Sequence, residues 1–289
     1  MKPAQFEYER PDTLEGILAV LAEKKGDAKI MAGGQSLVPM LNLRLLRPET
    51  LIDINGVTSE RYLKFDRKSL HVGMLARHAD FDNNPEVKEK LPLLARVVKD
   101  VAHVAIRNRG TFCGSVCHND PSAEWPLMSV LLDAEMEIRS HKKKRREKAQ
   151  NFFANIMTTT LAEDELLTGV RLMLPDKDAG WSFAEFNRRL GDFAIVSAAA
   201  IVRMKGGKIR EAKLALGGVA PTVTRMTEVE KSLVKQQPSQ ELWDQVAAAV
   251  SAGVSPTQDL QATENYRRHL AGVYATKVLK EAVAMAEGA

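Results

Sequence analysis

Apolar residues in the first 55 positions alternate between helical spacing and short continuous runs. A capping pair at the start and a glycine at the end predict a helix over 12–26. Its inward face is formed by residues three or four apart, namely Leu14, Ile17, Leu18 and Leu21. Buried strands are predicted over 28–32 and 51–54, with a helix over 37–46 between them. This is a small β-α-β-α-β unit, and its sheet is expected to be parallel.

The middle of the chain mixes helical and strand patterns. Strands are predicted over 69–74, 135–139 and 166–174, because these runs are short and rich in apolar residues. The stretch 85–104 predicts one or two helices, and 122–132 predicts a helix that is buried on one side. The inward residues expected in the first of these stretches are Leu91, Leu94, Val97, Val98 and Val101.

Turn-forming and charged residues at 175–180 predict a domain boundary. Beyond it the pattern predicts three strands and then three helices, over 181–188, 194–204, 208–216, 227–234, 240–252 and 263–286. A Gly206–Gly207 pair is expected to join the last two strands as a tight hairpin. The expected organisation is a first domain over 1–175, with subdomains over about 1–55 and 56–175, and a second domain over 176–289.

Composition and charge narrow the function classes. A chain of 289 residues with 45% hydrophobic and 27% charged residues is typical of a globular protein of about two domains. The formal charge of +4 is small, and the basic run at 141–148 contains no aromatic side chain on which a base can stack. This run therefore fits a solvated turn or exposed edge, with partner docking as the alternative, and no nucleic-acid partner is expected.

The cellular setting follows from what the sequence lacks. The N-terminus has no apolar signal-peptide core, and no stretch approaches the roughly 20 apolar residues of a membrane span. Cys113 and Cys117 are too few for a disulfide framework and too few to hold an iron–sulfur cluster alone. A cytoplasmic protein is the simplest expectation.

Two glycine-containing segments carry the candidate chemistry. In the first, Ala32–Leu37, a strand runs into paired glycines and then a helix, so that backbone N–H groups can approach an anion closely. A plain strand-to-helix turn explains it equally well. The second, Arg109–Ser115, again offers small residues, hydroxyls and backbone amides, and it leads to His118–Pro121. Two such segments on one chain can hold the two phosphates of a dinucleotide from opposite sides.

Other chemistry finds little support. Cys113, Cys117 and His118 are soft ligands four and five residues apart, but a zinc site requires four ligands and the chain has no second pair. Neither a Ser-His-Asp order nor a paired-carboxylate site emerges from the sequence. We therefore expect no metal and no catalytic side chain in this protein.

Several motifs in a fixed order give the chain a resemblance to the FAD-binding subunits of molybdenum hydroxylases. This family includes the carbon monoxide dehydrogenase medium subunits and the flavin domain of xanthine dehydrogenase. The similarity runs nearly end to end, through Phe6–Tyr8, Ala32–Ser36, Arg107–Thr111, Asn119–Glu124, Leu167–Val170 and Phe186–Ala194.

The resemblance implies an α+β protein. An FAD-binding fold of two α/β subdomains, of the vanillyl-alcohol oxidase type, would be followed by a C-terminal domain of antiparallel sheet and helices. It also implies a set of FAD-binding residues: Ile30, Met31, Ala32, Gly33, Gly34, Gln35, Ser36, Leu37, Val101, Ala102, Thr111, Cys113, Gly114, Ser115, His118, Asp120, Glu124, Leu167 and Phe193.

The resemblance assigns roles within this set. The two glycine segments would bind the pyrophosphate, Glu124 would accept hydrogen bonds from ribityl or ribose hydroxyls, and Leu167 and Phe193 would approach the rings. The family pattern has a glycine where this chain has Cys113, and a Cβ there requires a permissive backbone or a shifted loop.

The implied function is electron transfer. A small subunit with [2Fe–2S] clusters would pass electrons to FAD on this chain, and a large subunit would hold molybdopterin, in a dimer of heterotrimers. The alternative is a self-contained FAD-dependent oxidase or reductase, for which His118 is the only nearby acid–base candidate. The substrate pocket would lie on the molybdenum subunit, so the substrate and the terminal electron acceptor stay open.

Overall fold

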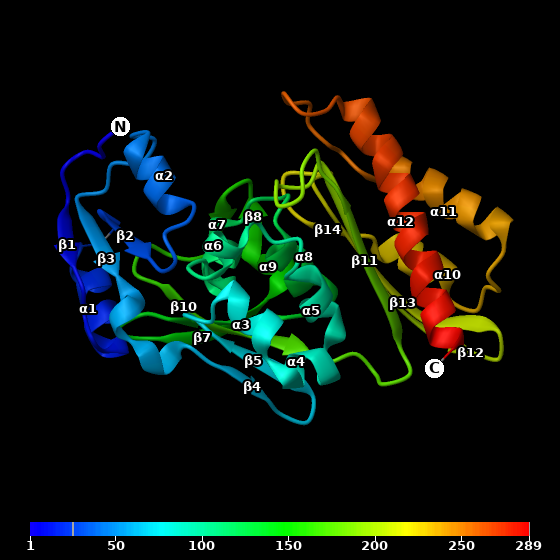
Figure 1. Cartoon of the computed structure of the whole chain (residues 1–289), viewed down its shortest axis with the longest axis horizontal. Coiled ribbons are helices and arrows are strands. Elements are labelled where there is room, and N and C mark those ends of the chain that lie inside the picture. Colours follow the sequence, from blue (N-terminus) through cyan, green and yellow to red (C-terminus); the bar gives the residue numbers. More distant parts are fainter. Residues whose placement is uncertain (25, 289) are drawn as a thin grey trace.

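The computed structural model describes residues 1–24 and 26–288, so the last residue of the predicted second domain lies outside the described residues. Three layered parts follow one another along the chain, from blue through green to red in Figure 1. The first is a small sheet with two helices, the second a larger sheet covered by short helices, and the third a sheet covered by long helices.

The first part is the expected parallel unit. Strands β1 (Glu7–Glu9), β3 (Thr50–Asp53) and β2 (Ala28–Met31) lie side by side in that order, and both pairs are parallel. Helix α1 (Leu14–Lys24) buries Ile17, Leu18 and Leu21 against the sheet, as the helical spacing predicted. The carboxyl ends of β2 and β3 therefore meet at one edge, where the segments after them lie close together.

Helix α2 (Leu37–Asn42) is shorter than the predicted helix over 37–46. Arg44 adopts a left-handed backbone with φ of +58°, which stops the helix, and its side chain donates a hydrogen bond to the Lys2 carbonyl oxygen. Leu43 and Leu45 beyond the helix end are exposed. The apolar pattern extends past the end of the helix, but Leu43 and Leu45 pack against no core. The pattern alone therefore predicted too long a helix.

The second part is built on an antiparallel five-stranded sheet. Its strands, in spatial order, are β4 (Leu63–Phe65), β5 (Ser69–Gly73), β10 (Leu166–Met173), β6 (Glu135–Arg139) and β7 (Lys144–Lys148). Most of the basic run at 141–148 forms the edge strand β7, in agreement with the exposed edge expected from the sequence. Arg145 in it pairs with Glu147 and Glu165, at 2.6 and 2.7 Å.

Short helices cover this sheet. They are α3 (His78–Asn83), α4 (Pro85–Lys90), α5 (Pro92–Val97), α6 (Val104–Arg107), α7 (Phe112–His118), α8 (Glu124–Leu131) and α9 (Ala149–Phe152), followed by the small hairpin β8 (Phe153–Asn155) and β9 (Thr158–Thr159). The predicted one or two helices over 85–104 are interrupted at Leu91, because Pro92 disfavours a helical conformation in the residue before it. Phe81, Phe112 and Trp125 form the aromatic centre of the core, with ring centroids 4.8–5.5 Å apart.

The third part follows the predicted order of strands and helices. A sheet of β11 (Gly180–Phe186), β12 (Val196–Lys205), β13 (Lys208–Gly217) and β14 (Thr224–Arg225) is antiparallel throughout. Helices α10 (Thr227–Leu233), α11 (Gln240–Gly253) and α12 (Glu264–Glu287) follow, and α12 crosses the sheet on one face (Figure 1). Gly206 and Gly207 both have positive φ, as the tight hairpin requires.

A charged cluster links the second and third parts. Asp133, in the turn between α8 and β6, pairs with Lys213 at 2.6 Å and with Arg225 at 2.9 Å. Arg225 also donates to the Val130 carbonyl oxygen at 3.1 Å and pairs with Glu230. The cluster joins the end of α8 to β13 and β14.

The packing of α12 on β11 gives a test of the third part. A Cβ at Gly180 would overlap the Ala282 carbonyl oxygen and lie 2.5 Å from the Ala286 nitrogen, so Gly180→Ala must push α12 outward. Such overpacking costs about 2 kcal/mol, and we expect a lower midpoint in thermal unfolding. Gly288→Ala is the matched control, because its Cβ would meet its nearest neighbour at 3.6 Å. Equal midpoints for the two variants would contradict this packing.

Candidate functional site

The first glycine segment lies where the sequence placed it. Residues 32–36 leave the carboxyl end of β2 and enter α2, with Gly34 at a φ of +72°. The Gln35 side chain donates to the Gly33 carbonyl oxygen at 2.9 Å, and the Val38 N–H donates to the Gly34 oxygen at 2.9 Å. The left-handed glycine turns the chain between β2 and α2.

This segment has unused hydrogen-bond donors. Within the described part of the chain, no backbone N–H group of residues 33–37 donates a hydrogen bond. Consecutive free amides in a turn form a concave anion-binding surface, and a pyrophosphate supplies the acceptors that they require. The residues present therefore fit the phosphate groups of a dinucleotide cofactor.

The second segment is more helical than expected. Thr111 caps α7, since its Oγ1 accepts a hydrogen bond from the Gly114 N–H at 3.0 Å. Cys113 consequently lies in the first turn of a helix, where a Cβ causes no strain, and its side chain is buried with Sγ 3.8 Å from the Gly73 carbonyl oxygen. The glycine of the family pattern is dispensable here because the backbone is helical.

The fold brings the two segments into contact. A Cβ at Gly33 would lie 2.5 Å from the Arg109 carbonyl oxygen and 2.6 Å from the Gly110 Cα. A Cβ at Gly114 would lie 3.9 Å from the Ala32 Cβ. Segments 77 residues apart in the sequence thus meet backbone to backbone, at the carboxyl edge of the parallel sheet.

A pair of side chains that the sequence did not single out joins these segments. Asn55, just after β3, donates from Nδ2 to the Ala32 carbonyl oxygen at 2.7 Å. Arg77 donates to Asn55 Oδ1 and to the Arg109 carbonyl oxygen. Asn55 follows the strand beside β2, so the parallel topology was a usable signal for it. Nothing local in the sequence marks Arg77.

His78 packs against the second segment at Gly110. Trp125 donates from Nε1 to His78 Nδ1 at 2.9 Å, so the ring proton resides on Nε2. Burial lowers the pKa of His78 to about 3, and the ring is therefore neutral. The backbone N–H of His78 donates to the Gly110 carbonyl oxygen at 3.1 Å, and the His78 ring fills the space that a Gly110 Cβ would occupy.

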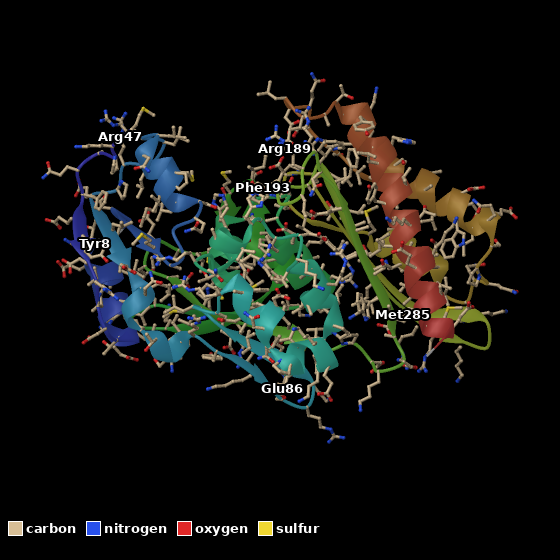
Figure 2. All side chains as sticks on the ribbon, viewed as in Figure 1. Tyr8, Arg47, Glu86, Arg189, Phe193 and Met285 are labelled. Atoms are coloured by element: carbon tan, nitrogen blue, oxygen red, sulfur yellow. The ribbon has the colours of Figure 1, made fainter. Side chains whose placement is uncertain are left out.

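The predicted loop at Gly191–Phe193, in the C-terminal part, contacts the predicted residue Ala102. A Cβ at Gly191 would lie 2.8 Å from the His103 ring and 3.1 Å from the Ala102 carbonyl carbon, so this loop lies on the segment before α6. Arg107 holds that segment by donating to the Val101 and Ala102 carbonyl oxygens at 3.0 and 2.8 Å. Phe193 in the same loop is 47% exposed, at the boundary between the second and third parts (Figure 2).

The remaining predicted residues lie in or next to α7 and α8, and in β10, which packs against α7. Ser115 and His118 are partly buried in α7, and Asp120 accepts a hydrogen bond from the Ser122 N–H at 2.8 Å. Leu167 is buried in β10, which packs against α7. Burial raises the pKa of Glu124, the first residue of α8, to about 7, and the charges of Asp100 and Asp120 add to the effect.

A second acidic residue with a raised pKa was missed. Burial raises the pKa of Glu185 in β11 to about 9, and the charges of Glu124 and Asp100 contribute. Its Oε2 is buried without a hydrogen-bond partner in the described residues. It lines a hollow of ≈ 380 Å³ between α5, β11 and α12, together with Arg96, Asp100 and Lys277. No sequence pattern marks a lone glutamate in a strand.

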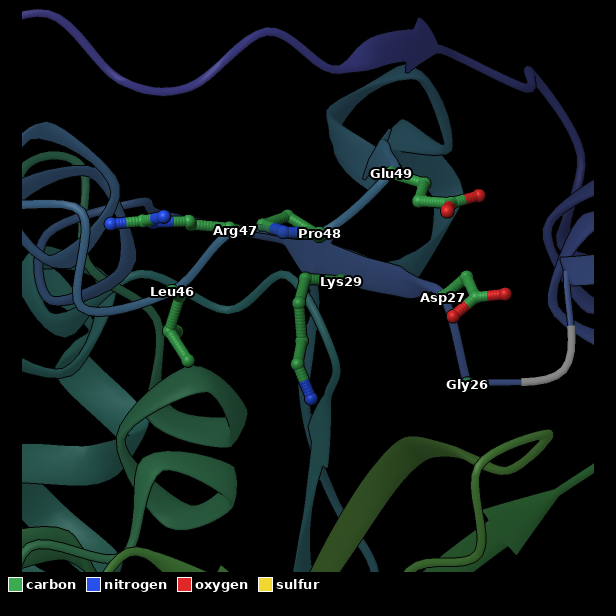
Figure 3. A pocket seen from close by; sticks show the side chains of 7 residues that line it. All are labelled: Gly26, Asp27, Lys29, Leu46, Arg47, Pro48 and Glu49. Atoms are coloured by element: carbon green, nitrogen blue, oxygen red, sulfur yellow. The ribbon is translucent and has the colours of Figure 1, made fainter.

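Another hollow, of ≈ 290 Å³, lies at the opposite end of the parallel sheet (Figure 3). It is lined by the segments that lead into β2 and β3, 26–29 and 46–49. The Lys29 and Arg47 side chains diverge there, while Asp27 and Glu49 point away from them (Figure 3). Because it lies at the amino ends of these strands, it is separate from the glycine segments.

The two thiols are poor candidates for chemistry. Both are free, and burial raises the pKa of Cys113 well above its usual value and that of Cys117 to about 12. In the described ranges, no three His, Cys, Asp or Glu side chains gather in a way that could hold a metal ion. None of the helices described here has the length and apolar character needed to cross a bilayer.

Comparison with known proteins identifies the architecture. Residues 4–175 match the family model of the FAD-binding domain in molybdopterin dehydrogenase, and residues 181–282 match that of the CO dehydrogenase flavoprotein C-terminal domain. The chain is 33% identical over 283 residues to the caffeine dehydrogenase subunit beta of a Pseudomonas species, covering 98% of this chain and 96% of that one.

Solved structures agree closely. Carbon monoxide dehydrogenase from Hydrogenophaga pseudoflava has a chain that superposes with a TM-score of 0.96 at 32% identity, covering 99% of both chains. A chain of quinoline 2-oxidoreductase from Pseudomonas putida 86 superposes with a TM-score of 0.94 at 34% identity, covering 99% of this chain and 100% of that one.

The fold and the paired glycine segments define an FAD-binding flavoprotein of the α+β class. More particularly, the chain belongs to the family of FAD-binding medium subunits of the molybdenum hydroxylases. Members of this family are the flavoprotein chains of multi-subunit oxidoreductases with small and large partner subunits. The family and fold predicted from the motifs are confirmed, as is FAD as the cofactor.

The contact between the glycine segments can be tested at Gly33. In Gly33→Ala the new methyl group would collide with backbone at Arg109 and Gly110, which cannot rotate away, so the segments must separate. We expect loss of FAD from the purified protein, measured by flavin absorbance per chain. Gly288→Ala is the control, because its φ of -96° suits any residue and a Cβ there would meet its nearest neighbour at 3.6 Å. Full FAD occupancy in Gly33→Ala would contradict the contact.

Proposed function

We propose that FAD binds across the two glycine segments and along the boundary with the C-terminal part, in contact with the predicted residues between Ile30 and Phe193. The observation that carries this proposal is the run of unused amides at 33–37 beside Arg109 and Gly110. Under this proposal residues 1–175 form the FAD-binding domain and residues 176–289 form the domain that closes over the flavin.

The division of labour between cofactor and chain is simple. Bound FAD supplies the redox chemistry, by taking up electrons and passing them on. The amides of residues 33–37 hold the pyrophosphate, Glu124 accepts hydrogen bonds from ribityl or ribose hydroxyls, and Phe193 lies beside the ring. The side chains bind and orient the cofactor, and none of them forms a bond to substrate.

The partners follow from the family. We propose that a small subunit with [2Fe–2S] clusters delivers electrons from a large molybdopterin subunit, and that the complex is a cytoplasmic dimer of heterotrimers. Two free cysteines cannot build a cluster on this chain. Relatives of nearly equal identity are named for caffeine, carbon monoxide and quinoline, which supports a substrate pocket on another subunit.

The exposed loop at Gly191–Phe193 is the proposed contact with the small subunit. Electron transfer between chains requires the flavin edge to lie near a partner's cluster, so the ring cannot be sealed inside this chain. Leu190 and Phe193 are exposed apolar side chains on this loop. We propose that the loop is mobile in the isolated chain and ordered in the complex.

Co-expression with the two partner chains tests the function as a whole. We expect a coloured complex with one FAD on each copy of this chain, and bleaching of the flavin absorbance on addition of the complex's substrate. Omission of the small subunit should leave FAD bound and abolish the bleaching. A stable chain without affinity for FAD would refute the proposal.

Phe193→Ala tests the position of the exposed loop. Loss of an aromatic side chain that stacks beside the ring should slow reduction of bound flavin through the partner chain or weaken FAD retention. The fold should be unaffected because the side chain is exposed. Stopped-flow flavin absorbance and FAD titration measure the two effects, with Leu260→Ala, at a fully exposed apolar residue, as the control. Wild-type values for both would remove Phe193 from the site.

The raised pKa of Glu124, about 7, predicts a pH-dependent affinity for FAD. Hydroxyl donors stabilise the charged carboxylate, so FAD should bind more tightly as the pH rises through 7. Between pH 6 and pH 8 the dissociation constant should fall by about tenfold. Glu124→Gln cannot ionise and should show a flat profile over this range, measured by quenching of flavin fluorescence. Equal slopes for the two proteins would exclude the proposed role of Glu124.

A further inference from the structure

The joint between the glycine segments carries a positive charge, that of Arg77, which forms no ion pair in the described residues. Arg77 directs its guanidinium to neutral acceptors, the Asn55 side-chain oxygen and the Arg109 carbonyl oxygen. Among the described residues it makes no ion pair with a carboxylate. Asp80 and Asp53 attract this charge without pairing with it. Both oxygens of Asp80 bind Arg61, at 2.6 and 3.0 Å, and one of them also accepts the Arg77 backbone N–H.

This arrangement is unfavourable for the protein alone. Arg77 is partly buried, and the neighbouring cations Arg61 and Arg109 repel it. Burial and these two charges lower the pKa of Arg77 by more than the attraction of Asp80 and Asp53 raises it, so the surroundings on balance oppose its positive charge. A partly buried cation without a partner destabilises a fold, and such groups persist where a ligand supplies the missing charge.

The neighbouring groups indicate what that ligand is. Arg77 binds Arg109 O, the atom that a Gly33 Cβ would meet, and Asn55 binds Ala32 O at the start of the amide run. The Asn55–Arg77 pair therefore lies directly at the joint of the two segments. The amides there are neutral donors, and amides beside a fixed cation are the combination that phosphate oxygens prefer.

We propose that Arg77, held in place by Asn55, is the charged member of an oxyanion site at this joint and binds a phosphate group. The inference rests on the proposed function, in which that group is the pyrophosphate of FAD. It adds a residue outside both glycine segments and gives it a role that the backbone amides cannot fill, which is neutralisation of phosphate charge.

Arg77→Met separates this role from a structural one. Removal of a charge-assisted hydrogen bond should weaken FAD binding about 10- to 100-fold. The dependence of the dissociation constant on salt concentration should become less steep, because one attractive charge is gone. Without ligand the unfolding temperature should change little, because the relief of a partly buried charge offsets the loss of the hydrogen bonds to Asn55 and the Arg109 carbonyl oxygen. Weaker binding combined with a lower unfolding temperature would mean that Arg77 only supports the fold, and would overturn the proposal.

Two further variants sharpen the comparison. Arg77→Lys keeps the charge and loses the planar fork, so its affinity should be intermediate and its salt dependence that of the wild type. Arg146→Met removes a guanidinium that lies on the edge strand β7 and is already paired with Glu137 at 2.8 Å. It should change neither the affinity for FAD nor the salt dependence of that affinity. If the FAD dissociation constants of Arg77→Met and Arg146→Met depend equally steeply on salt concentration, the proposal is overturned.

ADP carries the same pyrophosphate without the flavin and distinguishes the possible failures. We expect Arg77→Met to weaken ADP and FAD by similar factors, measured by calorimetry for ADP. If the wild-type chain binds ADP but has no affinity for FAD, and Arg77→Met weakens ADP binding, the proposed function is refuted and the oxyanion site is supported. FAD and ADP binding that is unchanged in Arg77→Met would refute the oxyanion site and leave the proposed function intact.

Discussion

The backbone contact between Gly33 and Arg109–Gly110 is the constraint on which the candidate site depends. Two separately built layers must deliver these peptides to the same place. The parallel sheet directs the first to its carboxyl edge, and the five-stranded sheet with its aromatic centre holds the second. Only a residue without a side chain allows the two backbones to meet. The packing of the first part against the second therefore determines the geometry of the proposed FAD-binding surface.

The site concentrates groups that are costly for the fold. Glu124 and Glu185 are carboxyl groups whose pKa values are raised by burial, and Arg77 lacks a carboxylate partner in the described residues. Asp133 at the same boundary is instead paired with Lys213 and Arg225. The groups left without a charge partner are thus those near the proposed FAD site, where local stability and ligand binding make opposite demands.

Local patterns in the sequence predicted local structure well. The spacing of Ile17, Leu18 and Leu21 predicted a helix face, and Gly206–Gly207 predicted a hairpin, because both depend on neighbours in the chain. The helix over 37–46 was predicted too long because the left-handed Arg44 is a single-residue event that no periodicity reports. Likewise, the cap at Thr111 converts part of an expected loop into a helix.

The site was predicted only in part, for a related reason. Motif order identified both glycine segments and the family, since those residues lie within short stretches. Asn55, Arg77 and Glu185 act through contacts with residues far away in the sequence, such as Arg77 with Arg109. Their importance follows from the meeting of separate layers, and a single sequence carries no record of which layers meet.

The edge strand β7 has a consequence for crowded conditions. An uncovered outer strand offers free backbone groups to which another copy of the sheet can add. Here that strand carries Lys144, Arg146 and Lys148 on an exposed flank, so two copies approaching edge to edge bring like charges together. The repulsion disfavours growth into a continuous ribbon of sheets. Newly made chains that have not yet met their partner subunits are in this way protected from aggregation through the edge of their largest sheet.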